Sequence, residues 1–243
     1  MAGKSEAGRV GCRGDDLGLV GVHGRHVDCG VENPVTYDQA FYQQQNPIAL
    51  ESARAMLPAV LVFTGARSVV DVGCGVGAWA SVAKNEGCTV RGVDGNVPVD
   101  QLLLEAREFV RGDLTAGYPC SGFDLAVCLE VAEHLPESSA PALVGGLCRA
   151  EWVLFSGAHP GQGGVDHQNE RWGTWWERLF EDRGYLGSSM LKWRFWDDRR
   201  IQDYYLENVL LFASEKTWWR AGYDRSDLGA VDVIHPVRTG LWR

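Results

Sequence analysis

Residues 70–77, Val-Asp-Val-Gly-Cys-Gly-Val-Gly, decide the fold of this chain. They close a short apolar run, 68–72, that is rich in β-branched residues, and a segment with helical spacing follows from Trp79. A buried parallel strand, a glycine-rich turn and a helix give this pattern. Glycines let a ligand lie against the backbone, and the turn directs the first N–H groups of the helix at it. We therefore expect a nucleotide-like ligand at this turn.

The spacing of the glycines narrows the kind of ligand. It is G-x-G-x-G, which is neither the G-x-G-x-x-G of a dinucleotide fold nor a Walker loop, because no Gly-Lys-Ser/Thr follows. Asp94 ends the next expected strand 17 residues after Gly77. A carboxylate there can accept both ribose hydroxyls of an adenosine ligand. Asp113, after the third expected strand, is placed to meet the adenine amino group.

The rest of the chain alternates between strand and helix patterns. Strands are expected over 68–72, 89–94, 109–111, 123–129 and 152–155, with two further β-rich stretches at 189–195 and 206–213. Helices are expected over 36–62, 79–86, 140–149 and 172–182, and Pro58 predicts a kink or a break in the first. This alternation predicts an α/β fold with a doubly wound sheet. The first helix is suited to cover the open end of the ligand site.

Length and composition suggest one α/β domain, or one domain with a modest extension. We divide the chain into a flexible glycine-rich arm (1–32), a helical cap (33–66), the ligand-binding domain (67–215) and a C-terminal tail (216–243). The arm contains two cysteines and two histidines at spacings that fit no common zinc finger, so we interpret it as a polar segment. These residues are Cys12, His23, His26 and Cys29.

Charge and cysteine usage restrict the partners. The seven cysteines are odd in number and include no CxxC pair, which indicates free thiols and a cytoplasmic protein. No secretory signal and no uninterrupted apolar run of about 18 residues is visible, so we expect no membrane partner. The formal net charge of −9 argues against a broad nucleic-acid-binding surface. A homodimer is a possible assembly.

Several motifs together resemble the class I S-adenosylmethionine (SAM) dependent methyltransferases. They are VVDVGCGVGAWA (69–80), GVDG (92–95), GDL (112–114) and FDLAVCLEVAEHLP (123–136). The resemblance implies SAM as cofactor and a Rossmann-like, seven-stranded, mostly parallel sheet with helices on both faces and an N-terminal helical cap. It implies that the glycine loop lines the methionine end of SAM, that Asp94 holds the ribose and that Asp113 faces the adenine. The expected cofactor-binding residues are Asp71, Gly73, Cys74, Gly75, Asp94, Gly95, Asp113, Leu114, Leu129 and Glu130.

A narrower resemblance concerns the acceptor. The stretches 156–172, 193–200 and 204–212 look like those of a group of bacterial small-molecule methyltransferases, although His159 stands where that group has an aliphatic residue. We therefore expect methyl transfer to a small-molecule acceptor, at oxygen, in secondary metabolism or on a sugar. Tyr204, Tyr205 and Asn208 are candidate pocket residues.

His134 and His167 are the expected catalytic residues, because a histidine near pH 7 can hold or release a proton. The alternative is that they only brace their loops. We assign no metal, but Glu130, Glu133 and His134 form E-x-x-E-H, and His167 could complete a ligand set. That pattern resembles small-RNA 2′-O-methyltransferases and ubiquinone O-methyltransferases. A metal-assisted RNA or nucleotide 2′-O-methyltransferase, and a SAM-binding protein without turnover, therefore remain alternative functions.

Overall fold

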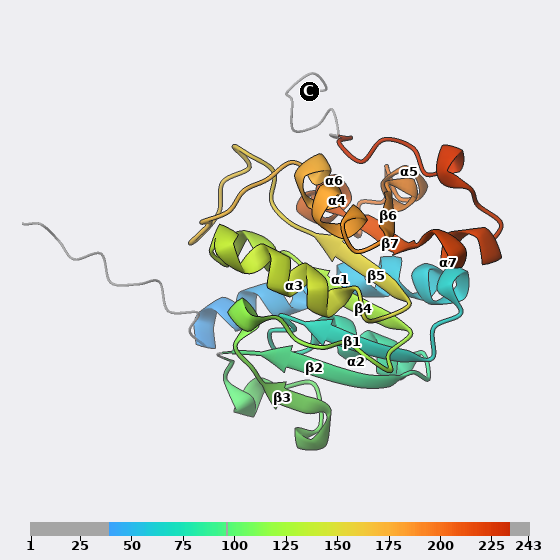
Figure 1. Cartoon of the computed structure of the whole chain (residues 1–243). Coiled ribbons are helices and arrows are strands. Elements are labelled where there is room, and N and C mark those ends of the chain that lie inside the picture. The colour runs from blue at the N-terminus through green and yellow to red at the C-terminus, as the bar shows by residue number, and fades with distance from the viewer. Residues whose placement is uncertain (1–38, 96, 234–243) are drawn as a thin grey trace, which may run out of the picture. The chain divides into compact units, whose positions relative to one another are not determined.

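The computed structural model describes residues 39–95 and 97–233 (Figure 1), with side chains from residue 46 onward. Seven strands form one sheet in the order β3-β2-β1-β4-β5-β7-β6. β7 runs antiparallel to both of its neighbours, and the other pairs are parallel. The strands are β1 (Ser68–Val72), β2 (Thr89–Asp94), β3 (Phe109–Arg111), β4 (Leu125–Leu129), β5 (Trp152–Ser156), β6 (Tyr185–Ser188) and β7 (Leu210–Ser214).

The described chain also contains seven α-helices and six short 3-10 helices. The α-helices are α1 (Gln39–Thr64), α2 (Ala78–Asn85), α3 (Ala140–Leu147), α4 (Gly173–Glu181), α5 (Met190–Arg194), α6 (Asp203–Asn208) and α7 (Glu215–Arg220). The 3-10 helices are η1 (Val99–Gln101), η2 (Ala106–Glu108), η3 (Leu114–Ala116), η4 (Ala132–His134), η5 (Glu137–Ser139) and η6 (Arg225–Asp227).

Side chains of the central strands alternate between two hydrophobic clusters, one on each face of the sheet. Val69 lies in a cluster with residues of α1, α2, α5, α6 and α7, whereas Val70 lies in a cluster with residues of α3 and α4. Successive strand residues point to opposite faces, so both faces of these fully buried strands are apolar. This arrangement confirms the Rossmann-like α/β fold with a doubly wound, seven-stranded and mostly parallel sheet.

Two expectations for the C-terminal half were wrong in secondary structure. The stretch 189–195 is the helix α5 rather than a strand, and the strand β6 comes just before it. The stretch 206–213 begins as the end of α6 and becomes β7 only at Leu210. Aromatic residues favour strands, but in 189–195 the buried side chains Leu191, Lys192 and Phe195 follow helical spacing.

The first helix is a single element. α1 contains Pro47 and Pro58 and is not divided into two helices. Over Asn46–Thr64 it is long and apolar enough to cross a membrane by length and composition alone, with a mean hydropathy of 1.3. Its face with Ala53, Met56 and Leu57 is fully buried and belongs to the hydrophobic core around α2. This packing buries only 33% of the apolar window, and Val62 on another face is 85% exposed, so it accounts for part of the apolar character of the helix.

The domain extends beyond the expected boundary at residue 215. Trp218 of α7 is fully buried, and its Nε1 donates a hydrogen bond to the carbonyl of Leu186 over 2.9 Å. Lys192 donates to the carbonyls of Val231 and Val233 over 2.9 and 3.2 Å. Residues 216–233 therefore pack onto the sheet. The arm 1–32, with the set Cys12, His23, His26 and Cys29, lies outside the described residues, and the five described cysteines are free.

Candidate active site

The glycine loop between β1 and α2 has backbone angles that favour glycine. Gly73, Gly75 and Gly77 have φ angles of 79°, 52° and 91°, a region that residues with a side chain rarely adopt. A Cβ on Gly73 would lie 2.3 Å from a methyl of Val131. The N–H groups of Gly73 and Cys74 both donate to the carbonyl of Val93, over 2.8 and 3.1 Å. The loop is thus held tightly between the carboxyl ends of β2 and β4.

Two carboxylates brace this loop. The Oδ2 of Asp71 accepts a hydrogen bond from the N–H of Ala80 in α2 over 3.1 Å. The Oδ2 of Asp94 accepts one from the N–H of Gly75 over 2.9 Å. Burial raises the pKa of Asp71 to about 7, against the lowering effect of the Ala80 hydrogen bond, and the charge of Asp94 raises it further. Asp71 is therefore a carboxyl group whose ionisation is sensitive to what binds beside it.

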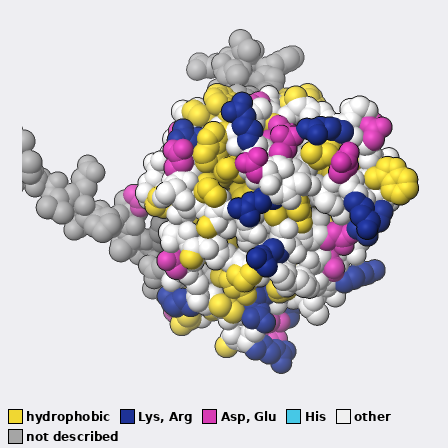
Figure 2. Space-filling model, viewed as in Figure 1, with side chains coloured by type: hydrophobic (Ala, Val, Ile, Leu, Met, Phe, Trp, Pro, Cys, Tyr) yellow, Lys and Arg dark blue, Asp and Glu magenta, His cyan; other side chains and the backbone are white. Residues whose placement is uncertain are grey.

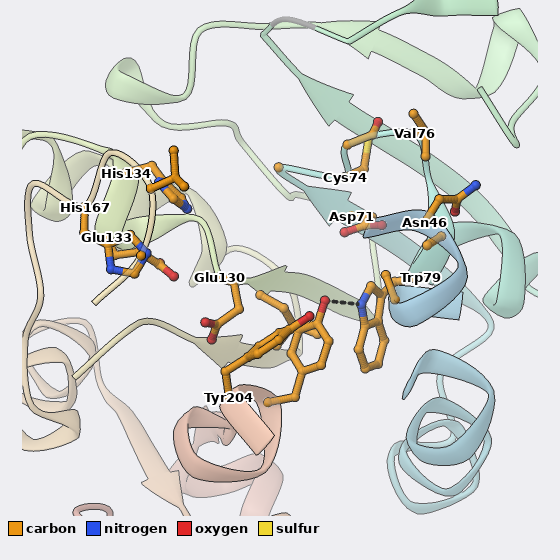
Figure 3. Close-up of a pocket in the computed structure, with 18 of the residues that line it drawn as sticks. Asn46, Asp71, Cys74, Val76, Trp79, Glu130, Glu133, His134, His167 and Tyr204 are labelled. Atoms are coloured by element: carbon orange, nitrogen blue, oxygen red, sulfur yellow. Dashed lines mark hydrogen bonds between the residues drawn. The ribbon is translucent and has the colours of Figure 1, made fainter. Parts of the chain in front are cut away.

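A cavity of about 390 Å³ opens at the carboxyl ends of β1 and β4, where ligands bind in folds of this type. In Figure 3, Asn46, Asp71 and Cys74 lie at one end of it, and Glu133, His134 and His167 lie at the other. Glu130 and Tyr204 lie between the two groups. The cavity therefore has a glycine-loop end and a carboxylate–imidazole end.

Glu130 occupies the middle of the cavity in a strained conformation. Its φ is 55° although it is not a glycine, and such residues are held in place by their surroundings, most often at functional sites. Its N–H donates to the Oγ of Ser156 over 3.0 Å, and its Oε1 accepts from the side-chain amide of Asn208 over 3.1 Å. The same amide donates to the Oε1 of Gln162 over 2.9 Å. These contacts fix the Glu130 carboxylate at the end of β4.

Glu133, His134 and His167 form a compact cluster. One potential ligand atom of each residue lies within 4.8 Å of the others, and the two imidazole rings are 5.0 Å apart in an edge arrangement. Glu133 is 1% exposed, and its carboxylate oxygens make no close hydrogen bond, although the carboxylate of Glu130 and the N–H of Ala158 lie near them. Burial raises the pKa of Glu133 and so does the nearby Glu130, whereas burial and then His167 lower the pKa of His134.

Backbone hydrogen bonds bring this cluster together from two segments. The N–H groups of Gln168 and Asn169 both donate to the carbonyl of Glu133, over 2.8 and 3.0 Å. The side-chain amide of Gln168 donates to the carbonyl of His134 over 3.1 Å. The loop that carries His167 is therefore fastened to η4, so that residues more than 30 positions apart share one site.

Eight of the twelve residues expected to bind the cofactor or to act in catalysis line the cavity. They are Asp71, Gly73, Cys74, Gly75, Leu129, Glu130, His134 and His167. The other four, Asp94, Gly95, Asp113 and Leu114, do not line it. The carboxylate of Asp113 instead accepts hydrogen bonds from the N–H and the hydroxyl of Thr115, over 2.9 and 2.7 Å, at the start of η3. The roles of Asp94 at the ribose and Asp113 at the adenine stay predictions.

Other elements add residues that were not among the expected cofactor-binding or catalytic residues. Asn46 and Ala49 of α1, Trp79 of α2 and Gln162 line the cavity, together with the expected Tyr204 and Tyr205. The Nε1 of Trp79 donates to the hydroxyl of Tyr205 over 3.3 Å, so α2 and α6 meet across the cavity. A large aromatic residue in the first turn of the helix after the glycine loop, Trp79, was a signal in the sequence that could have indicated such a wall residue.

The strand order and the glycine loop define a class I SAM-dependent methyltransferase, an enzyme whose cofactor is SAM. Sequence comparison supports the same conclusion, since the family model described as a methyltransferase domain matches residues 42–205. The chain belongs to this family. The cavity also fits this cofactor. Gly73 and Gly75 have no side chains, so the backbone beside Asp71 is accessible to a ligand.

Curated relatives match part of the chain. The ubiquinone biosynthesis O-methyltransferase of Paracidovorax citrulli is 38% identical over 106 residues, which are 37% of this chain and 43% of that protein. The protein of the same name from Pseudomonas syringae pv. tomato is 37% identical over 84 residues, 30% of this chain and 36% of that protein. The chain thus matches less than half the length of these relatives.

Solved structures share the fold. Magnesium protoporphyrin IX methyltransferase from Synechocystis, with bound SAH, superposes with a TM-score of 0.52 at 20% identity, over 72% of this chain and 87% of that one. A SAM-dependent methyltransferase from Archaeoglobus fulgidus gives a TM-score of 0.50 at 20% identity, over 62% of this chain and 77% of that one.

Proposed function

We propose that this enzyme transfers the methyl group of SAM to a hydroxyl oxygen of a small molecule, which it receives at the Glu133–His134–His167 cluster. The observation that carries this proposal is the Glu133 carboxylate, which is buried in the cavity wall without a close hydrogen bond to either oxygen. A buried charged or polar group without a partner costs free energy. Its presence beside a cavity supports a ligand that brings a hydrogen-bond donor or a positive charge.

Different residues of the cavity have different roles in such a reaction. SAM, when bound, supplies a methyl group that its sulfonium has already activated. The protein then has to align the acceptor oxygen with that methyl group and provide a place for the hydroxyl proton. The glycine loop and Asp71 suit the cofactor end, and Glu130 lies between that end and the cluster. Glu133 and His134 are the groups whose position allows them to accept the proton.

The same cluster fits a divalent cation. One carboxylate and two imidazoles with ligand atoms within 4.8 Å of one another are donors that Mn²⁺, Fe²⁺ or Zn²⁺ accept. Such a cation, when bound, would lower the pKa of a hydroxyl that it coordinates. Glu133, His134 and His167 would hold it, while Glu130 is already engaged by Asn208. We therefore propose these three residues as the ligands of a cation that assists the methyl transfer.

The cavity favours a small, uncharged acceptor over a nucleic acid. Among its described lining residues none is Lys or Arg, whereas Asp71, Glu130 and Glu133 are acidic. A phosphate-bearing acceptor would need basic side chains to neutralise it. The name of the partial relatives, ubiquinone biosynthesis O-methyltransferase, also supports a small-molecule hydroxyl.

A methyl-transfer assay tests the proposal. The protein is incubated with SAM and a panel of phenols, diols and sugars, with an RNA oligonucleotide in parallel, and methylated products are identified by mass spectrometry. We expect an O-methylated small molecule, and loss of activity in EDTA that Mn²⁺ restores would assign the cation. Methylation of the RNA alone, or no binding of SAM by folded protein, would refute the proposal.

Two matched variants assign the role of the cluster. Glu133→Gln is expected to lower kcat about 100-fold, a typical effect of losing a general acid or base, with SAM affinity nearly unchanged. Glu137→Gln is the control, because Glu137 is an exposed glutamate paired with Arg171 outside the cavity. An unchanged kcat in Glu133→Gln would remove this residue from the mechanism.

A further inference from the structure

Glu170 does not line the cavity, but it makes three hydrogen bonds to residues near it. Two of these partners line the cavity, and the third is next to a lining residue in the chain. Its Oε1 lies 2.9 Å from the Nδ1 of His167 and accepts from the N–H of Gly163 over 3.0 Å. Its Oε2 accepts from the N–H of Gly161 over 2.8 Å. One carboxylate is thus shared between a histidine of the cluster and the loop beside it.

The contact with Glu170 determines which nitrogen of His167 carries the hydrogen. A carboxylate is only an acceptor when ionised, so the Nδ1 of a neutral His167 must be the donor. The lone pair is then on Nε2, the one nitrogen left for a ligand in the cavity. The ring is also confined on its Nε2 side, where a Cβ on Gly164 would come within 2.2 Å of this nitrogen. Tautomer and position of the imidazole are therefore both constrained.

The same carboxylate gives the loop its shape. Gly161 and Gly163 have φ angles of 84° and 71°, so that both N–H groups converge on Glu170. The residues that follow each of them, Gln162 and Gly164, line the cavity, and Gln162 reaches Asn208. A loop this rich in glycine has little intrinsic preference for one conformation. Glu170 supplies the fixed point around which it folds.

We propose that Glu170 is a positioning residue that fixes the Nδ1–H tautomer of His167 and holds residues 161–164 against the cavity. It acts through His167 and does not touch the substrate. Where an acidic group orients a metal-binding histidine in this way, its loss typically lowers metal affinity 10- to 100-fold. The proposal rests on the proposed function only for its consequence, the affinity of the Glu133–His134–His167 cluster for a divalent cation.

Three variants and three measurements test it. Glu170→Ala removes all three hydrogen bonds, and Glu170→Gln keeps an acceptor for Nδ1 but presents an amide N–H₂ to one glycine N–H. Glu137→Gln is the control, since Glu137 pairs with Arg171 of the same loop without contacting His167. The measurements are the ¹⁵N NMR tautomer of His167 without metal at about pH 8.5, where histidine is neutral, the affinity for Mn²⁺, and the affinity for SAH.

In the wild type and in Glu137→Gln we expect the Nδ1–H tautomer. In Glu170→Ala we expect the Nε2–H form to become populated and Mn²⁺ affinity to fall at least about 10-fold, with SAH affinity nearly unchanged. A retained Nδ1–H tautomer in Glu170→Ala would overturn the proposal. If the wild type itself binds no Mn²⁺, the cation part of the proposed function fails, while the tautomer still decides the role of Glu170.

Amide hydrogen exchange of the loop covers the case in which Glu170→Ala does not fold and loses SAH affinity. In Glu170→Gln we expect the N–H of Gly161 to exchange at least about 10-fold faster than in the wild type, because it then faces the amide N–H₂ while the retained oxygen still serves Nδ1 of His167 and the N–H of Gly163. Unchanged exchange at Gly161 would overturn the proposal independently of any metal.

Discussion

At the scale of single residues, Gly73 is where the loop tolerates a side chain least. Gly73→Ala would force a non-glycine residue into φ 79° and place its Cβ 2.3 Å from Val131. The backbone term alone costs about 1–2 kcal/mol, and the clash adds to it because Val131 follows the strained Glu130 at the end of β4. We expect a loss of about 2–4 kcal/mol in the free energy of unfolding and loss of SAM binding, measured by urea denaturation and calorimetry.

Gly87→Ala separates the two contributions. Gly87 has a similar φ of 89°, but a Cβ there would meet nothing within 4 Å. We expect it to cost only the backbone term of about 1–2 kcal/mol and to leave SAM binding intact. Equal effects of the two substitutions would show that contact with Val131 does not matter.

Asp71 is expected to make the stability of the protein depend on pH. Its pKa rises on folding from 3.8 to about 7, chiefly through burial, so between these values the folded protein holds a proton that the unfolded chain has lost. The stability of the fold is then highest below about pH 4 as far as this group is concerned, and declines as the pH rises through about 7. The rise in pKa corresponds to at most about 4 kcal/mol.

Asp71→Asn should remove that decline. The amide keeps an oxygen for the N–H of Ala80 and cannot ionise. We expect the free energy of unfolding, measured in urea at about pH 5 and pH 8, to fall less with pH in the variant than in the wild type, by up to a few kcal/mol. Parallel pH dependences would mean that Asp71 is not the titrating group.

At the scale of elements, the sequence predicted the strands that surround the site. β1 and β5 differ from their expected ranges by no more than one residue, because each is a short apolar run bounded by turn residues, and this pattern reports burial on both faces. The residues at the ends of these strands could therefore be predicted as site residues. The glycine loop follows directly after β1, and Glu130 follows directly after β4, which ends at the expected residue 129.

The pattern failed where tertiary packing decides the structure. In α5 the exposed Trp193 and the buried Lys192 are neighbours, so residue type does not report burial there. The pairing of Glu133 with His167 depends on hydrogen bonds between residues 34 or more positions apart. Local periodicity contains no information about such contacts. The sequence could therefore indicate both histidines as candidates but could not show that His134 and His167 lie side by side.

The buried Lys192 gives a prediction at this scale. It anchors residues 231–233 to α5 through two carbonyls, and burial lowers its pKa to about 8. Lys192→Met keeps the volume but leaves the carbonyls of Val231 and Val233 without this donor, at about 1–3 kcal/mol. We expect faster amide exchange over residues 228–233 and a lower free energy of unfolding. Lys216→Met, at an exposed position of α7, is the control, and equal exchange in both variants would contradict this role of Lys192.

At the scale of the whole molecule, the position of the cavity follows from the order of the strands. β1 leads through α2 to β2 on one side, and β4 leads through α3 to β5 on the other. Connections that depart in opposite directions leave a crevice at the carboxyl ends of the central pair. The site is therefore shared by elements from both halves of the sheet, and α1, α6 and the loop 157–172 add its outer walls.

Charge distribution is the other property of the whole molecule, and it gives a prediction about RNA binding. The formal net charge is −9, and Figure 2 shows basic side chains interspersed with acidic ones on the face that it presents. Together with a cavity whose described lining has no Lys or Arg, this gives a phosphate backbone little to bind. We expect single-stranded and duplex RNA to bind with a Kd weaker than about 10⁻⁵ M at about 150 mM salt, measured by fluorescence anisotropy with SAH present. A tighter Kd that weakens steeply with salt would reveal a basic surface and make an RNA acceptor the better assignment.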